Sequence, residues 1–334
     1  MKSKRLEYID VAKGILIMLM VMGHTLNIAT YQPEANDFVR NVNLLETLYK
    51  GFYMCTFFVI TGYCSNFNKP FWNFTKANLK TIVLPAFSLF FINQSINLLY
   101  ACDFQVIDYL NFNFGCFFIN GLCAWFLAAL FVARNVYWFV LRFLKSEKYR
   151  FGLFVVLYAL GYYLSHRIQN YWSFQQAFMF LFFLEYGQYL KRTGNCFLKF
   201  PLVSLLIYIV GYLYTFYVTD NSIIGIHNSI SLTKATLVSN LIIAISASNL
   251  VLYVSRIVDQ NRLLQYFGEN SLIVYLLNWH VIVIAWDVLH PLLGTDVFVN
   301  VVCYLSVFLL TMSFSALLIN ILNLKYLRLA IGKS

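Results

Sequence analysis

Long apolar segments separated by short polar ones run through almost the whole sequence. A segment of about 20 predominantly apolar residues is long enough to cross a bilayer as a helix, and ten segments of roughly that kind are present. We therefore predict an all-α, polytopic integral membrane protein with about ten transmembrane helices. These cover approximately residues 11–30, 46–66, 80–100, 120–143, 151–165, 173–190, 200–219, 233–254, 271–289 and 298–321.

The low content of charged residues excludes a soluble globular protein. Only 11% of the residues are charged, against about 25% in soluble domains. No linker or polar block between the apolar segments is long enough to form a second domain. We therefore expect a single transmembrane domain over residues 1–334.

Lysine and arginine residues are distributed unevenly between the segments that connect the predicted helices. If the N-terminus lies in the cytoplasm, 18 basic residues fall on the inner side, and only Arg40, Lys50 and Arg167 fall on the outer side. This bias follows the positive-inside rule and predicts a multi-pass protein of the cell (plasma or inner) membrane with both termini cytoplasmic. It also explains the net charge of +10, so we expect no nucleic-acid partner.

The cysteine and histidine residues do not have the spacing of a metal site. The seven cysteines form no CxxC pair and no Cys/His cluster, so we predict no bound metal. Cys102 and Cys116 could meet in an extracytoplasmic loop, and the sequence leaves open whether they pair.

The first apolar segment carries three ionisable side chains, Asp10, Lys13 and His24. On a helix, Lys13 and His24 lie about 20° apart around the axis and about 16 Å apart along it, with Asp10 about 40° from His24 on the same face. Asp10 and Lys13 could simply pair with each other, but no residue one turn from His24 could neutralise it. A neutral imidazole in a polar cavity is a natural general base, so we predict His24 as catalytic base, with Asp10 and Lys13 on the same catalytic face.

Two further charges, Arg134 and Glu185, lie within predicted helices. Both fall in the inner halves of their segments, the fourth and the sixth. Buried charges in membranes usually pair with one another, so we expect these two to form a structural ion pair.

Several short motifs resemble those of the membrane acyltransferase-3 family and occur in the family's order. The first is a basic residue, ten residues and then a histidine, here Lys13 to His24, preceded by "YID" at 8–10. The others are "FFVITGY" (57–63), "KANLKTIVLP" (76–85), "AWFLAALF" (124–131), "FFLEYGQYLKRTG" (182–194) and "FGENSLIVYLLNWH" (267–280). The chain is most similar to short, fucose O-acetylase-like members without an appended extracytoplasmic domain.

Three positions depart from the family's pattern. The paired arginines that precede the proline are here Lys76 and Lys80, which keep the charge but lose the bidentate guanidinium group. Ala86 follows the proline where an aromatic residue is common. Asn278 stands where the ninth helix often has histidine, and His280 lies two positions further, about 200° around the helix.

The resemblance implies an integral membrane O-acyltransferase. It would move an acyl group, acetyl by default, from cytoplasmic acyl-CoA to a sugar hydroxyl of a cell-surface or lipid-linked glycan. Acyl-CoA would be a co-substrate, and no cofactor would be bound permanently. The acyl group, the acceptor sugar, and whether the protein forms a homo-oligomer are left open.

The same resemblance points to candidate substrate-binding residues. Lysines on the cytoplasmic side would meet the phosphates of the donor, and aromatic or amide groups would donate hydrogen bonds to the developing oxyanion. A second histidine on the ninth helix is the next candidate for the base. These residues are Lys76, Lys80, Tyr63, Trp125, Asn278 and His280.

Two other classes of function remain open on the sequence. A polytopic exporter of a glycan or acylated intermediate could use the ionisable residues of the first helix to line its path, although no inverted repeat is visible. A non-catalytic membrane scaffold would leave His24 without an explanation.

Overall fold

The computed structural model describes residues 6–30, 48–101, 115, 117–119, 121, 124–194, 199–218, 225–226, 232–292 and 297–333. Every regular element within these ranges is helical, and none of them is a strand. The main helices are α1 (Glu7–Thr30), α3 (Tyr53–Cys64), α4 (Phe71–Asn78), α5 (Leu84–Ala101), α7 (Trp125–Phe143), α8 (Glu147–Ser165), α9 (Phe174–Arg192), α10 (Pro201–Val218), α11 (Leu237–Ile257), α12 (Arg262–Glu269), α13 (Ser271–Leu289) and α14 (Val297–Leu322). Cys102 and Cys116 lie outside the described residues.

Six of the described helices are long and apolar enough to cross a membrane, namely α1, α7, α10, α11, α13 and α14. Each of the ten predicted segments contains a helix, but the count of ten spans is not confirmed. Helix α3 has only 12 residues, which is too short to span the hydrocarbon core. Helix α8 starts with a charged turn, and α9 carries buried glutamine and glutamate side chains. The prediction of an all-helical membrane protein is therefore confirmed over the described residues, and the number of spans stays a prediction.

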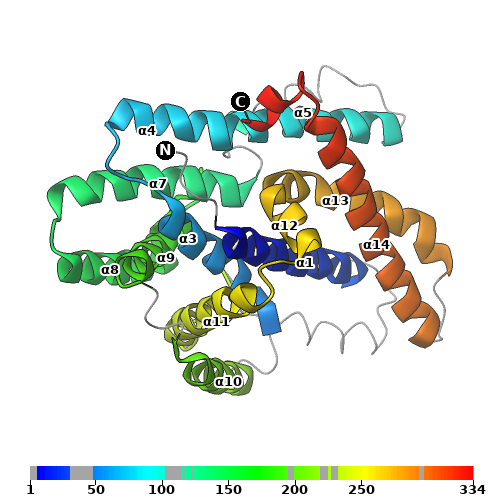
Figure 1. The fold of residues 1–334 in the computed structure, drawn as a ribbon. Helices are drawn as coiled ribbons and strands as arrows, with labels where there is room; N and C mark the ends of the chain where they lie inside the picture. Colours follow the sequence, from blue (N-terminus) through cyan, green and yellow to red (C-terminus); the bar gives the residue numbers. More distant parts are fainter. Residues whose placement is uncertain are drawn as a thin grey trace.

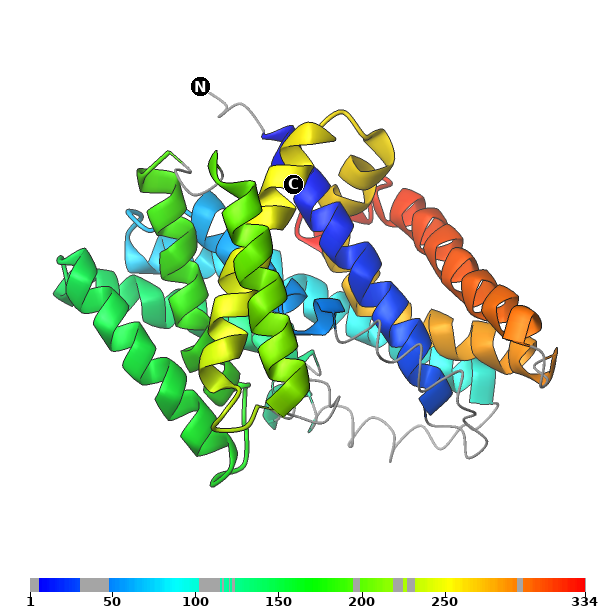
Figure 2. The same cartoon turned by 90° about the horizontal axis from the view of Figure 1, so that it is seen from below.

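Helix α1 lies in the middle of the molecule (Figure 1) and packs against α3, α11, α12, α13 and α14. The hairpins α8–α9, α10–α11 and α13–α14 surround it, and each pair packs along its length. The turned view shows α1 running obliquely through the molecule, with α12 beside its N-terminal end (Figure 2). The ionisable face of α1 therefore meets other helices, as the cost of charge in hydrocarbon requires.

Glycines bring two pairs of helices into backbone contact. A Cβ atom at Gly187 of α9 would collide with the carbonyl oxygen of Val59 on α3, and one at Gly62 of α3 would collide with that of Leu184 on α9. Helices α1 and α12 approach in the same way at Gly14. Small residues allow such close packing in membranes, where van der Waals contact rather than water exclusion holds helices together.

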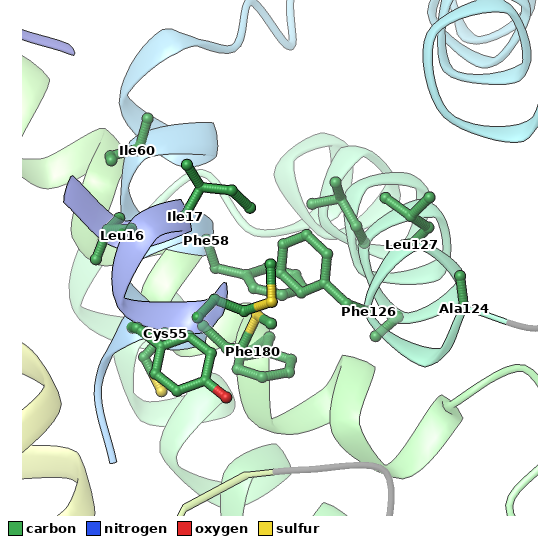
Figure 3. Close-up of a cluster of buried hydrophobic side chains, with 14 of the residues drawn as sticks. Leu16, Ile17, Cys55, Phe58, Ile60, Ala124, Phe126, Leu127 and Phe180 are labelled. Atoms are coloured by element: carbon green, nitrogen blue, oxygen red, sulfur yellow. The ribbon is translucent and has the colours of Figure 1, made fainter. Parts of the chain in front are cut away.

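A cluster of buried apolar side chains joins α1, α3, α7 and α9 (Figure 3). The Phe58 and Phe180 rings stack with their centroids 4.0 Å apart, and the Phe126 ring meets Phe58 edge-on at 5.4 Å. Offset-stacked and edge-to-face pairs are the favoured arrangements of aromatic rings. This cluster fixes α7 against α1 and α3 and forms one wall of the cavity described below.

A π-helical segment, Leu79–Val83, connects α4 to α5, so that the three form the long rod along the top of Figure 1. Pro85 follows it and lacks a backbone N–H, so the carbonyl one turn earlier loses its helical partner. Such a disturbance is a known cause of local π-helical geometry, and π-helical turns occur frequently at functional sites.

The two ends of the described chain lie on the same side of the molecule. The Lys333 ammonium donates hydrogen bonds to Asn270 Oδ1 at 2.7 Å and to Asn323 Oδ1 at 2.9 Å. Asn270 directly follows α12, and the Gly268 Cα of that helix packs against the Asp10 backbone of α1. The contacts of Lys333 therefore place the last described residues next to α12 and the N-terminal end of α1.

A buried charged cluster links α7, α8 and α9 and corrects one expectation. Glu185 is buried and accepts hydrogen bonds from Arg150 at 3.0 and 3.1 Å, from Arg192 at 2.8 Å and from the Tyr137 hydroxyl at 2.5 Å. The expected Arg134–Glu185 pair is therefore wrong, because the two arginines of α8 and α9 occupy the carboxylate. Arg134 is not part of this cluster and instead lines two cavities.

Candidate active site

His24 pairs with an asparagine of α13. Its Nδ1 lies 2.7 Å from Asn278 Oδ1, and the Trp279 ring meets the imidazole edge-on with centroids 5.8 Å apart. Asn278 is fully buried. The contact joins two distant parts of the sequence. It gives the imidazole of His24 a hydrogen-bond partner in a part of α1 whose neighbouring residues are mostly apolar.

The hydrogen bonds of Asn278 determine which nitrogen of His24 carries the proton. Asn278 Nδ2 donates to the carbonyl oxygens of Val274 at 3.0 Å and Tyr275 at 2.6 Å. Because the amide nitrogen faces these two acceptors, the amide oxygen must face His24 and accept from Nδ1–H. The neutral imidazole then has its lone pair on Nε2, as a general base requires.

A cavity of about 250 Å³ lies between α1, α3, α7, α13 and the π-helical segment. Most of its wall is apolar and includes Ile17, Phe126 and Leu127 of the cluster in Figure 3. Tyr275 also lines it, and its ring lies 5.4 Å from that of Phe126. Asn278 follows Tyr275 by about one helical turn, but neither Asn278 nor His24 is among the residues that line this cavity.

A second cavity of about 360 Å³ adjoins the first. Lys13, Ile60, Thr61 and Arg134 line both cavities. Polar side chains of the segment after α3, from Cys64 to Lys69, line only the second one. Together the two cavities form a passage. The second cavity is its polar and basic part, and the first cavity is its apolar part.

Lys13 lies at the junction of the two cavities and is paired as expected. Its Nζ is 3.3 Å from Asp10 Oδ1, and its side chain is 30% exposed. Asp10 itself is buried. The i, i+3 pair leaves the ammonium partly open toward the cavities.

Tyr63 is not brought to His24. The Tyr63 hydroxyl accepts a hydrogen bond from the Tyr8 hydroxyl at 3.0 Å, and Tyr8 lies 16 positions before His24, about 24 Å along α1. The Trp125 ring stacks on Phe180 with centroids 6.3 Å apart, and its role at the site stays a prediction.

The two lysines and the second histidine are also separate from the passage. Lys76 and Lys80 are exposed, and neither is among the residues that line the two cavities. His280 is partly buried and lies two positions from Asn278, on another face of α13. No contact between His280 and His24 occurs within the described part of the chain.

Arg134 is a polar residue of this region that sequence reasoning did not connect to the site. It was expected to pair with Glu185 instead. The only sequence signal for Arg134 was its depth within an apolar helix, which marks function as readily as structure.

Comparisons with known proteins give one match. The family model described as an acyltransferase domain, Acyl_transf_3, matches residues 6–320. None of the curated proteins and none of the solved structures matches the chain.

Proposed function

Because the chain belongs to the acyltransferase-3 family of membrane acyltransferases, we propose that it transfers an acyl group, acetyl by default, from cytoplasmic acyl-CoA to a sugar hydroxyl of a cell-surface or lipid-linked glycan. The observation that carries this proposal is the His24–Asn278 pair, which leaves Nε2 of His24 as the nitrogen that can accept a proton. The matched range covers every residue of the pair and of the cavity wall.

His24 acts as the general base in this proposal. The sugar hydroxyl attacks the thioester carbonyl carbon while Nε2 of His24 accepts the hydroxyl proton. The carbon–sulfur bond then breaks, and the proton passes from the imidazolium to the departing thiolate. Asn278 is a positioning residue, because its amide oxygen holds the tautomer of His24 and its amide nitrogen is already bound to α13.

The passage gives the two substrates different routes. The donor enters through the polar cavity that Lys13 lines and extends its thioester into the apolar one. The acceptor hydroxyl reaches His24 from the other side, since His24 lies about 16 Å beyond Lys13 along α1. The apolar wall excludes water from the thioester, which limits hydrolysis.

An exporter is the alternative, with Asp10, Lys13 and His24 lining a transport path. The hydrogen bond that fixes the tautomer of His24 favours the enzyme, because a proton path does not need one nitrogen to be kept free for a substrate hydroxyl. Acyl transfer by purified protein in detergent separates the two functions, since no transport can occur there.

The experiment that tests the proposal is a comparison of His24→Gln with His166→Gln. Glutamine keeps hydrogen bonding and approximate size but does not accept a proton at neutral pH. We expect His24→Gln to lower kcat by about 10²–10⁴-fold without loss of folded protein. His166 is exposed in the segment after α8, so its variant serves as the matched control. Near-normal turnover by His24→Gln, together with loss of turnover in His280→Gln, would show that His280 is the base instead.

A further inference from the structure

We infer that Arg134 and Lys13 form the phosphate-binding part of the donor site, with the two cations binding the phosphates of coenzyme A. This inference rests on the proposed function and specifies which residues recognise the donor. It moves that role away from Lys76 and Lys80, which the basic motif before the proline had indicated.

Arg134 lies at the junction of the two cavities without an anionic partner. It lines both of them, and none of the ion pairs among the described residues includes it. Its Nε is buried and has no hydrogen-bond partner in that part of the chain. The guanidinium carbon lies 5.4 Å from the Phe74 ring centroid, which holds the charge in place without neutralising it.

The depth of Arg134 makes this arrangement costly for a purely structural residue. It lies near the middle of α7, nine positions after Trp125 and nine before Phe143, about 13 Å from either end. An arginine at that depth needs a partner or water. A phosphate that binds from the open cavity supplies both the charge and the acceptor oxygens that the guanidinium lacks.

Asn78 is not part of this site. Its Nδ2 and Oδ1 also have no hydrogen-bond partner among the described residues, but the side chain is fully buried and lines neither cavity.

The chemistry of Arg134 and Lys13 selects the ligand. Guanidinium and ammonium groups match phosphate oxygens. Coenzyme A carries phosphates at one end and amides along the arm that leads to the sulfur, in the same order as the basic and apolar parts of the passage.

Binding of coenzyme A to the purified full-length protein in detergent tests the inference. Free coenzyme A has no acyl group to transfer, so calorimetry measures affinity without turnover. Pantetheine, which has the amides but no phosphate, and ADP, which has phosphates but no arm, separate the two parts. The variant is Arg134→Gln, with Arg142→Gln as control. Arg142 is also on α7 and lines neither cavity; its guanidinium stacks on Trp138 and donates to the carbonyl oxygens of Phe67 and Lys69.

We expect Arg134→Gln to weaken coenzyme A and ADP binding by at least about tenfold, the usual effect of removing a charge-assisted hydrogen bond, and to leave pantetheine binding unchanged. Arg142→Gln should change none of these affinities.

Several results would overturn the inference. Normal coenzyme A affinity of Arg134→Gln, or an equal loss of pantetheine affinity, would show that Arg134 is structural. Loss of affinity in the Lys76→Gln/Lys80→Gln double variant alone would return the phosphate site to α4. Wild-type protein that binds no coenzyme A would refute the proposed function as well.

Discussion

Removal of the buried carboxylate that joins α7, α8 and α9 should strongly destabilise the protein. Glu185→Gln keeps the shape of the side chain but leaves Arg150 without its counter-charge. The Glu185 side chain is 0% exposed and that of Arg150 is 7% exposed, so water cannot replace the lost partner. The Tyr137 hydroxyl of α7 also loses its charged acceptor.

The magnitude follows from burial, and the chain contains a matched control. Breaking a buried ion pair by removing one partner costs about 3–5 kcal/mol, a factor of at least about 100 in the unfolding equilibrium. Arg192 contacts both Glu185, at 2.8 Å, and a second carboxylate, Glu147, at 2.9 Å. The side chains of Arg192 and Glu147 are each 38% exposed. Glu147→Gln should therefore cost at most about 1 kcal/mol.

Unfolding in mixed detergent micelles of increasing denaturing strength, followed by circular dichroism, measures both variants against the wild type. A third variant, Glu185→Met/Arg150→Met, removes both charges and should recover most of the loss, because an apolar pair avoids the cost of burying ions. Equal destabilisation by Glu185→Gln and Glu147→Gln would refute the reasoning from burial. Failure of the double variant to recover stability would show that the arginine has a second essential role.

The remaining predictions concern packing, catalysis and topology. Gly187→Ala should destabilise the protein by about 1–3 kcal/mol, because the new methyl group would meet the Val59 carbonyl. Gly152 has open space around it, so Gly152→Ala should stabilise the protein by about 0.4–1 kcal/mol in the same unfolding assay. Asn278→Leu should lower kcat roughly tenfold through loss of one hydrogen bond to His24 and leave the KM for acyl-CoA unchanged in steady-state kinetics, so a change confined to KM would contradict a positioning role. A reporter that works only in the cytoplasm should be active when it is fused to the C-terminus, and a reporter that works only on the extracytoplasmic side should be inactive there. The reverse result would contradict the predicted orientation.

Sequence periodicity predicted the helices and the ionisable face of α1 because both follow from spacing along one segment. Partners of charged residues were harder to predict. Arg134 and Glu185 lie at similar depths in their helices, and depth alone could not show that Arg150 lies beside the carboxylate. Contacts between helices depend on how the helices rotate and cross, which spacing within one helix does not determine.

The role of Asn278 shows the same limit at the site itself. Its position in a family-like motif indicated that it belongs near the reaction, and the structure does place it against His24. Its chemical role depends on which carbonyls occupy Nδ2, and that is set by the backbone of α13. Tyr63 belongs to an equally suggestive motif, yet it lies at the other end of α1 beside Tyr8.

The last described residues have a consequence for the order in which the protein is assembled. Gly332, with a positive φ of 71°, lies against the carbonyl of Lys80 and the ring of Pro85, and Ile331 is buried beside them. The ribosome makes this segment after every helix that it touches. The cavity wall formed by the π-helical segment Leu79–Val83 therefore remains incompletely packed until residue 332 has been translated. The passage therefore reaches its final shape only after residue 332 has been made.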